Sequence, residues 1–148
     1  MFRGVAKLSL DSKGRLTVPS RYREALLVRC AGRLVITADF DKCLLIYPQP
    51  DWEPIQQKLM ERSSFNPRIR GLQRQLVGHA EDIEMDAVGR VLVSSALREF
   101  AALDKNVVLV GQGNRFELWD KEQWDQVLGR GTGFGDGELP PELEGFSL

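Results

Sequence analysis

The sequence predicts a mainly β protein with helices, an α+β fold built from two copies of one small unit. Two observations support this prediction. Residues 11–24, DSKGRLTVPSRYRE, return as residues 86–99, DAVGRVLVSSALRE, with the same spacing of Asp, Gly and Arg. The apolar runs LVIT (34–37) and VVLV (107–110) extend the match further along each copy. A repeat of this length indicates a duplicated structural unit rather than chance.

Each unit has the same order of predicted elements: an extended segment, a turn, a short apolar strand, a helix and a β-hairpin. Asp11 and Asp86 begin the turns, and Gly14 and Gly89 end them. These are the residue types that a tight reversal prefers. The predicted ranges are 5–10, 11–14, 16–18, 19–27 and 34–47 in the first copy, and 81–85, 86–89, 91–93, 94–102 and 107–119 in the second.

The repeat divides the chain into four expected segments. They are a first repeat at 1–50, a helical connector at 51–77, a second repeat at 78–128 and a tail at 129–148. Trp52, Ile55 and Leu59 give the connector the spacing of an amphipathic helix, and Asn66 with Pro67 begins a second helix, to about 76. The tail is rich in glycine, so we expect it to be mobile or loosely docked. It also holds Pro140, Pro141 and the acids Asp136, Glu138, Glu142 and Glu144.

One unit is too small to fold alone. Four short strands and a small helix bury little apolar surface and leave strand edges unpaired. Two units in one chain can cover each other's apolar faces by interleaving their hairpins into one barrel. Phe2, Phe116 and Trp119 then remain as apolar groups for contacts between chains, which would give a closed symmetric assembly.

Composition limits the classes of function. The chain has 148 residues, 43% of them hydrophobic, and a net charge of −1, which does not by itself favour a nucleic-acid binder. Cys30, Cys43 and the single His79 have no metal or redox spacing, so we expect free thiols in a cytosolic protein with no metal and no cofactor. Charges interrupt the N-terminus and no run of about 18 apolar residues occurs, so we expect no signal peptide and no membrane span.

The positive charge is concentrated in the first copy. Residues 1–30 hold seven basic groups and two acids, a balance of +5, whereas residues 78–102 hold two basic groups and five acids, a balance of −3. Neutralising phosphates requires Lys and Arg on one face, and the first copy supplies the surplus. The alternative interpretation is a solvated basic surface without a ligand.

Arg15 is the strongest candidate for DNA contact. It follows a glycine turn, so its side chain can project from a hairpin tip, where a guanidinium can grip phosphate or read guanine with two donors. The alternative is an ion pair with Asp11 that holds the turn, and both roles can coexist. The same two interpretations apply to Arg90 with Asp86, where the nearby acids favour the ion pair.

Further basic side chains lie in and near the two turns. Arg21 and Arg23 are just inside the helix that Ser20 is expected to cap, where backbone N–H groups favour anions. The full set of predicted DNA-binding residues is Arg3, Lys7, Lys13, Arg15, Arg21, Arg23, Arg90 and Arg98. The turn and orienting residues are Asp11, Gly14, Asp86 and Gly89.

Four segments resemble a known family. MFRGVAKLSLDSKGRLTVPSRYRE, CLLIYPQPDWE, GHAEDIEMDAVGRVLV and LVGQGNRFELWD resemble MraZ proteins along nearly the whole chain, and each half is similar to the SpoVT–AbrB swapped-hairpin domain. The repeated Asp-x-x-x-Arg is similar to that family's signature. The second copy has Ser94 and Ala96 in place of Pro19 and Arg21, so we expect it to contribute less to DNA contact.

The resemblance implies both a fold and a function. The fold would be two swapped-hairpin halves that form a pseudo-dimeric β-barrel. The function would be that of a sequence-specific DNA-binding transcription regulator, a repressor of the division and cell-wall gene cluster that binds short direct promoter repeats as a ring oligomer. The expected partners are double-stranded DNA and other copies of the chain, on the nucleoid in the cytoplasm, with no small-molecule substrate.

Two other classes of protein stay open beside the regulator. A structural ring or scaffold is compatible with the acidic tail, but it would not need seven positive groups in thirty residues. An enzyme would need a site, yet His79 has no repeated partner and GQGN (111–114) lies in a hairpin rather than between a strand and a helix. We therefore expect the protein not to be an enzyme.

Overall fold

The computed structural model describes residues 1–131 and 140–146, and within these ranges it has eight strands and five α-helices. The strands are β1 Phe2–Ser9, β2 Arg15–Thr17, β3 Arg33–Ala38, β4 Leu44–Pro48, β5 Glu81–Glu84, β6 Arg90–Leu92, β7 Asn106–Gly113 and β8 Phe116–Asp120. The helices are α1 Ser20–Cys30, α2 Gln49–Met60, α3 Pro67–Leu72, α4 Ser95–Phe100 and α5 Lys121–Arg130, with a π-helical turn η1 Gln73–Val77 and a 3₁₀ turn η2 Pro141–Leu143. All strand pairs are antiparallel, so the fold is of the mixed α and β class that the sequence predicts.

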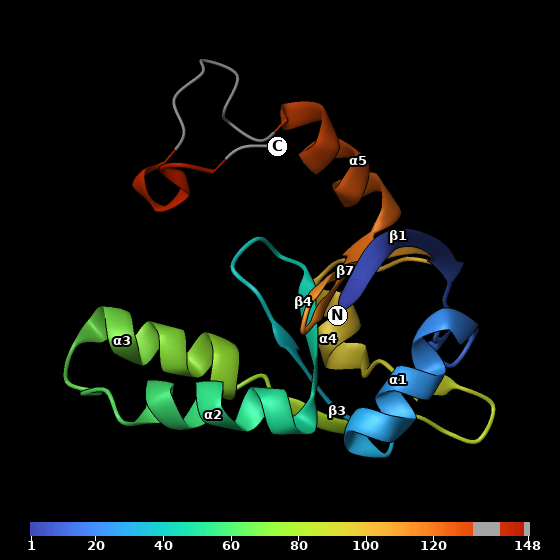
Figure 1. Cartoon of the computed structure of the whole chain (residues 1–148), viewed down its shortest axis with the longest axis horizontal. Coiled ribbons are helices and arrows are strands. Elements are labelled where there is room, and N and C mark those ends of the chain that lie inside the picture. Colours follow the sequence, from blue (N-terminus) through green and yellow to red (C-terminus); the bar gives the residue numbers. More distant parts are fainter. Residues whose placement is uncertain (132–139, 147–148) are drawn as a thin grey trace.

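Strands of the two sequence copies pair with each other. A six-stranded sheet has the order β1-β7-β8-β4-β3-β5, and a separate two-stranded ribbon joins β2 to β6. The first strand of each copy therefore lies on the hairpin of the other copy: β1 pairs with β7 (Figure 1), and β5 pairs with β3. This exchange covers strand edges that one unit alone would expose.

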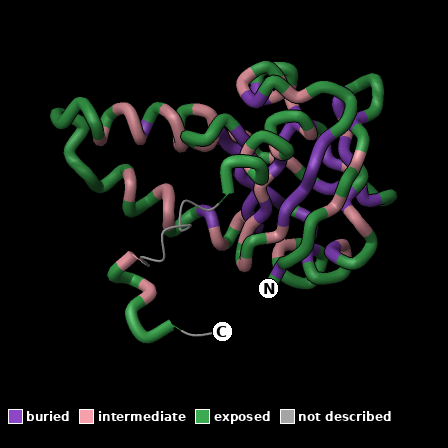
Figure 2. The backbone as a smooth tube through the Cα atoms, turned by 90° about the horizontal axis from the view of Figure 1, so that it is seen from above, coloured by how far each residue is buried: buried purple, intermediate pink, exposed green. Residues whose placement is uncertain are grey.

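The main core lies between the six-stranded sheet and the β2–β6 ribbon. Leu16 of β2 and Val91 of β6 are each 1% exposed and face the apolar residues of the sheet, with Leu26 of α1 and Leu97 of α4 packed beside them. The buried residues run through the strands, while the surrounding turns and helices are mostly exposed (Figure 2). The ribbon therefore covers the core, with one face buried against it and the other face outward.

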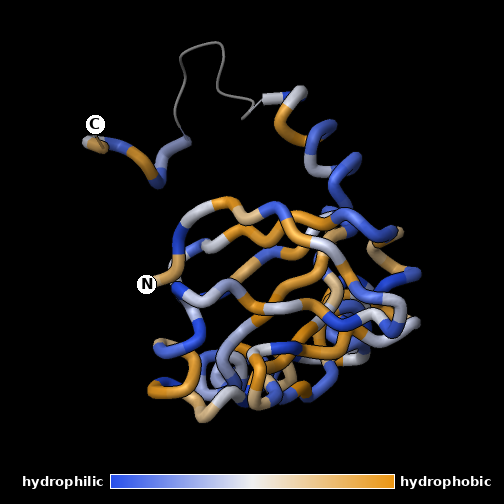
Figure 3. The backbone as a smooth tube through the Cα atoms, turned by 90° about the vertical axis from the view of Figure 1, so that its right-hand side faces the viewer, coloured by the Kyte–Doolittle hydropathy of each residue, from blue (hydrophilic) through white to orange (hydrophobic). Residues whose placement is uncertain are grey.

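Two helices cover the outer face of the sheet in equivalent places. Trp52 of α2 packs on Val35 and Tyr47, and Trp124 of α5 packs beside Val108 and Trp119. The hydrophobic residues accordingly concentrate along the strands (Figure 3). Both tryptophans therefore serve packing against the sheet.

The connector forms a helical arm beside the sheet. Helices α2 and α3 run side by side (Figure 1), and the side-chain amide of Gln73 joins them by donating to the carbonyl oxygens of Leu59 and Arg62, each at 3.1 Å. The side chain of Asn66 accepts the N–H of Arg68 at 2.9 Å and so caps α3, as the Asn-Pro pair predicts.

The apolar residues that the sequence leaves for contacts between chains are instead buried within the chain. Phe2 lies on Phe116 with ring centroids 4.4 Å apart, because β1 crosses onto the hairpin of the second copy. Trp119 is 4% exposed, because Trp124 of α5 lies over it.

Ser20 does not cap α1 as the sequence predicts. Pro19 precedes the helix, and no side chain caps it.

The predicted tail at 129–148 lies partly outside the described residues. Asp136 and Glu138 lie outside them, while Glu142 and Glu144 are exposed. Helix α5 continues through Gly129 to Arg130. Among the described helices, none combines the length and the apolar character that crossing a membrane requires.

Candidate nucleic-acid interface

The turn between β1 and β2 is held by one carboxylate. Asp11 Oδ1 accepts the backbone N–H groups of Lys13 and Arg15 at 2.9 and 2.8 Å, and its Oδ2 accepts Arg15 Nε at 2.7 Å. Gly14 closes the turn by donating its N–H to the Asp11 carbonyl at 3.0 Å, with a φ of +84° that favours glycine. These donors stabilise the ionised carboxylate and, led by the Arg15 N–H, lower the pKa of Asp11 to about 2.

The turn between β5 and β6 repeats this geometry. Asp86 accepts the N–H groups of Val88 and Arg90 at 3.0 and 2.8 Å, and Arg90 Nε at 2.9 Å. Gly89 has a φ of +86°. Hydrogen bonding, chiefly from the Arg90 N–H, lowers the pKa of Asp86 below its ordinary value. Both arginines therefore form the ion pair that was one of the two interpretations of the motif.

The ribbon brings the two motif arginines onto one face. In the β2–β6 register Arg15 lies opposite Leu92, and Thr17 lies opposite Arg90. Residues opposite each other in an antiparallel pair point to the same side, and alternate residues share it. Since Leu16 and Val91 point into the core, the outward set is Arg15, Thr17, Arg90 and Leu92. We call this set the ribbon face.

The tips beside the ribbon face differ in charge. Lys13 is exposed at the tip of the first turn, and the equivalent residue of the second turn is Val88, which is 57% exposed. The ribbon face therefore lies between a basic tip and an apolar one.

Arg23 and Arg98 approach the turns from the helices. Both are half-buried, and each gives its Nε to a backbone carbonyl of its own half: Arg23 to Val18 at 2.7 Å, and Arg98 to Val93 at 3.0 Å. Each arginine also contacts the turn glycine of the other half, Arg98 at Gly14 and Arg23 at Gly89. The sequence alone did not predict these contacts between the halves.

Three of the predicted basic residues lie away from the ribbon face. Arg3 and Lys7 occupy outward positions of β1, since Phe2, Ala6 and Leu8 of that strand face the core. Arg21 is exposed in the first turn of helix α1, and its guanidinium lies over the ring of Tyr22 at 4.8 Å. None of the three belongs to the ribbon face.

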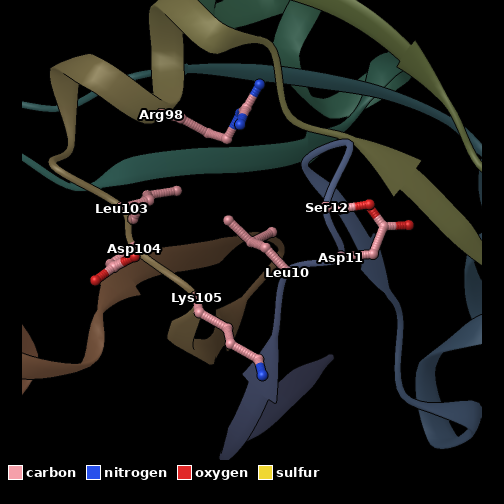
Figure 4. Close-up of a pocket in the computed structure, with 7 residues that line it drawn as sticks. All are labelled: Leu10, Asp11, Ser12, Arg98, Leu103, Asp104 and Lys105. Atoms are coloured by element: carbon pink, nitrogen blue, oxygen red, sulfur yellow. The ribbon is translucent and has the colours of Figure 1, made fainter.

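A pocket of about 490 Å³ opens beside the first turn (Figure 4). Its walls come from both halves: Leu10, Asp11 and Ser12 lie on one side, and Arg98, Leu103, Asp104 and Lys105 lie on the other. The lining side chains include neither a thiol nor an imidazole.

His79 and Cys43 do not line this pocket. His79 Nδ1 lies 2.9 Å from the carbonyl oxygen of Gln75. Cys43 is fully buried, and its sulfur lies with carboxylate oxygens of Asp39 and Glu117 in a group within 4.8 Å. Burial, followed by these two carboxylates, raises the pKa of the Cys43 thiol. The pairing of β4 with β8 creates this group of potential ligands, so the linear spacing of the cysteines could not reveal it.

Comparison with known proteins adds a family. The sequence model of one family, described as "MraZ protein, putative antitoxin-like", matches residues 1–75 and 76–131. A protein of Nitrosospira multiformis is 64% identical over 148 residues, a protein of Thiobacillus denitrificans is 60% identical and a protein of Nitrosomonas eutropha is 59% identical. In each case the match covers 100% of both chains, and each relative carries the name "Transcriptional regulator MraZ".

Proposed function

This chain belongs to the MraZ family of transcriptional regulators, and we propose that it acts by binding double-stranded DNA at specific sequences. The observation that carries the proposal is the ribbon face. It presents Arg15 and Arg90 on the outward side of two short antiparallel strands whose other side is core. A two-stranded ribbon fits the major groove of DNA, where arginine can read guanine with two donors.

The ion pairs support this role for Arg15 and Arg90. Each carboxylate takes the Nε of its arginine and holds the guanidinium beside the ribbon. A guanidinium has further N–H donors beyond Nε, so a partner can engage it while the ion pair persists. Holding the arginine before binding reduces the side-chain entropy that binding would otherwise cost.

The charge of the tips makes the first turn the principal contact. Lys13 adds a positive charge beside Arg15, whereas Val88 adds none beside Arg90. The second copy is also acidic, with a balance of −3 over residues 78–102. Phosphates therefore approach the first tip at a lower electrostatic cost, and we assign the smaller DNA contribution to Arg90.

The strand exchange supports the finer description of the fold. Each half gives its first strand to the hairpin of the other half, and the two turns are related across the β2–β6 pair. This is the arrangement expected of two swapped-hairpin halves in a pseudo-dimeric barrel. One chain then presents two turns, as a dimer of single halves would.

Regulation by this protein would depend on assembly. We propose a homo-oligomeric ring that places several ribbon faces on short direct repeats and represses the promoter of the division and cell-wall gene cluster, on the nucleoid. Weak single contacts become tight when linked, provided that the spacing of the repeats matches that of the subunits. We propose no small-molecule substrate, cofactor or catalytic step.

The test is fluorescence anisotropy with a tandem-repeat promoter fragment, a single repeat and a scrambled duplex, over a salt series. We expect the tandem fragment to bind best and binding to weaken as salt rises. Arg15→Ala should cost about 1–3 kcal/mol per contact, and the matched Arg90→Ala should cost less.

Three outcomes would contradict parts of the proposal. Equal affinity for one repeat and several would remove the role of the ring. Equal losses in the two variants would show that both turns contact DNA alike. Binding to none of the duplexes by a folded oligomer would favour the structural scaffold.

A further inference from the structure

Arg98 of the second half lies against the turn of the first half. A Cβ placed on Gly14 would be 2.7 Å from both the Nε and the Cζ atoms of Arg98, so the guanidinium packs directly on the glycine. Val93 completes the contact. Its carbonyl accepts Arg98 Nε at 3.0 Å, and its N–H donates to the carbonyl of Gly14 at 3.0 Å.

Arg23 makes the reciprocal contact. A Cβ on Gly89 would be 2.5 Å from its Nε and 2.8 Å from its Cδ. The carbonyl of Val18 accepts Arg23 Nε at 2.7 Å, and the N–H of Val18 donates to the carbonyl of Gly89 at 2.8 Å. Each helix arginine is therefore fixed by its own half while it packs on the turn of the other.

We propose that Arg98 is a positioning residue for the first turn, the one that presents Arg15 to DNA, and that Arg23 positions the second turn. The proposal rests on the DNA-binding function proposed above. Each arginine thus supports the turn of the other sequence copy rather than the turn of its own copy. Arg98 lies in the acidic copy yet supports the basic tip, and Arg23 lies in the basic copy yet supports the acidic copy's tip.

The contacts of Arg98 give it a positioning role. Its Nε donates to the carbonyl of Val93, and its Nε and Cζ atoms lie against Gly14, so the side chain is held between its own half and the opposite turn. Figure 4 shows the side chain extending from α4 toward the turn that carries Asp11 and Ser12. A planar guanidinium suits this packing, and a lysine ammonium does not reproduce it.

The experiment compares Arg98→Ala, Arg98→Lys, Arg23→Ala and the wild-type oligomer in two assays. The first is the anisotropy titration with the tandem-repeat duplex over a salt series. The second is hydrogen exchange followed by mass spectrometry, without DNA, on peptides that cover 10–16 and 85–91. Arg98→Lys keeps the charge and most of the side chain, so it remains informative where Arg98→Ala fails to fold.

We expect both Arg98 variants to weaken DNA binding about tenfold, as the loss of one base-reading arginine does. Arg23→Ala should weaken binding less. Exchange should rise in 10–16 for the Arg98 variants and in 85–91 for Arg23→Ala, in each case across the halves. The salt slope should stay near that of the wild type, because no phosphate contact is lost.

Other results would overturn the inference. Recovery of affinity in Arg98→Lys, or a salt slope lowered by about one with unchanged exchange in 10–16, would make Arg98 a phosphate contact itself. Exchange that rises only within the mutated half would also overturn it. Where the wild type binds no DNA, the proposed function fails, and the exchange assay still decides whether the arginines act across the halves.

Discussion

The two turns of the molecule have the same backbone and different surfaces. Asp11 and Asp86 each accept three equivalent donors at nearly the same distances. Gly14 and Gly89 have φ values of +84° and +86°. Between them, Ser12 and Lys13 of the first turn become Ala87 and Val88 of the second. The comparison separates two requirements: Asp, Gly and Arg build the turn, and the residues between them set what it can bind.

The helices that follow the two turns differ in how they begin. Helix α4 is capped by Ser94, whose hydroxyl oxygen accepts the N–H of Leu97 at 3.3 Å and whose O–H donates to the Glu81 carboxylate at 2.8 Å. Helix α1 has Pro19 in that place and begins without a side-chain cap, yet it is the longer helix. Packing of Tyr22 and Leu26 in the core supports α1 instead.

The largest expected effect comes from separating the two halves. A fragment of residues 1–77 should show no cooperative unfolding as a monomer, because β1 and β2 pair with β7 and β6 of the missing half. Circular dichroism on heating, together with size-exclusion chromatography, checks this. Mixing with a fragment of residues 78–148 should restore the transition. A transition in 1–77 alone that is independent of concentration would show that one half is self-sufficient.

A smaller effect is expected from filling the glycine positions. Gly14→Ala and Gly89→Ala should each lower the free energy of unfolding by about 1–3 kcal/mol, because alanine is strained at positive φ, and the new methyl group displaces Arg98 or Arg23. Denaturant unfolding measures both changes. DNA affinity should fall more for Gly14→Ala, which sharpens the comparison of the turns.

Gly71→Ala is the matched control for these substitutions. Gly71 lies in helix α3 with no atom within 4 Å of an added Cβ. Alanine there should leave stability unchanged or raise it by about 0.5–1 kcal/mol. A loss equal to that of the turn variants would mean that neither positive φ nor the arginine contact causes their effect.

The smallest expected effect is that of the turn carboxylates. Both have lowered pKa values, so their contribution to stability is present above the ordinary value of 3.8 and is lost as pH falls, through about 2 for Asp11. Asp11→Asn and Asp86→Asn should therefore lower Tm at pH 7, and the difference from the wild type should shrink as pH falls below 3.8, for Asp11 down to about pH 2. A difference that stays constant with pH would assign the effect to the amide rather than to the lost charge.

Sequence reasoning predicted the elements that depend on local patterns. The Asp and Gly residues predicted both turns, and the apolar runs predicted the hairpins β3–β4 and β7–β8 within a few residues. It also gave the ion pair as one role for Arg15, since Asp11 lies four residues before it. These features depend on residues close together in the chain.

Features that depend on the strand exchange were harder to predict. Phe2 and Phe116 read as surplus apolar groups because their contact joins the two ends of the chain. The packing of Arg98 on Gly14 and the proximity of Cys43 to Glu117 arise in the same way. No local spacing encodes such contacts, and the repeat alone does not specify which half supplies each partner.

The exchange of strands also has a consequence for the order of events during translation. The first strand, Phe2–Ser9, leaves the ribosome early, but its partner ends at Gly113. At about 5–20 residues per second, roughly a hundred further residues take about 5–20 s to synthesise. Throughout that interval the strand's edge is open, and a neighbouring nascent chain on the same messenger can supply the missing hairpin. The architecture that makes one chain resemble a dimer thus also creates a period in which true dimers can form by misassembly.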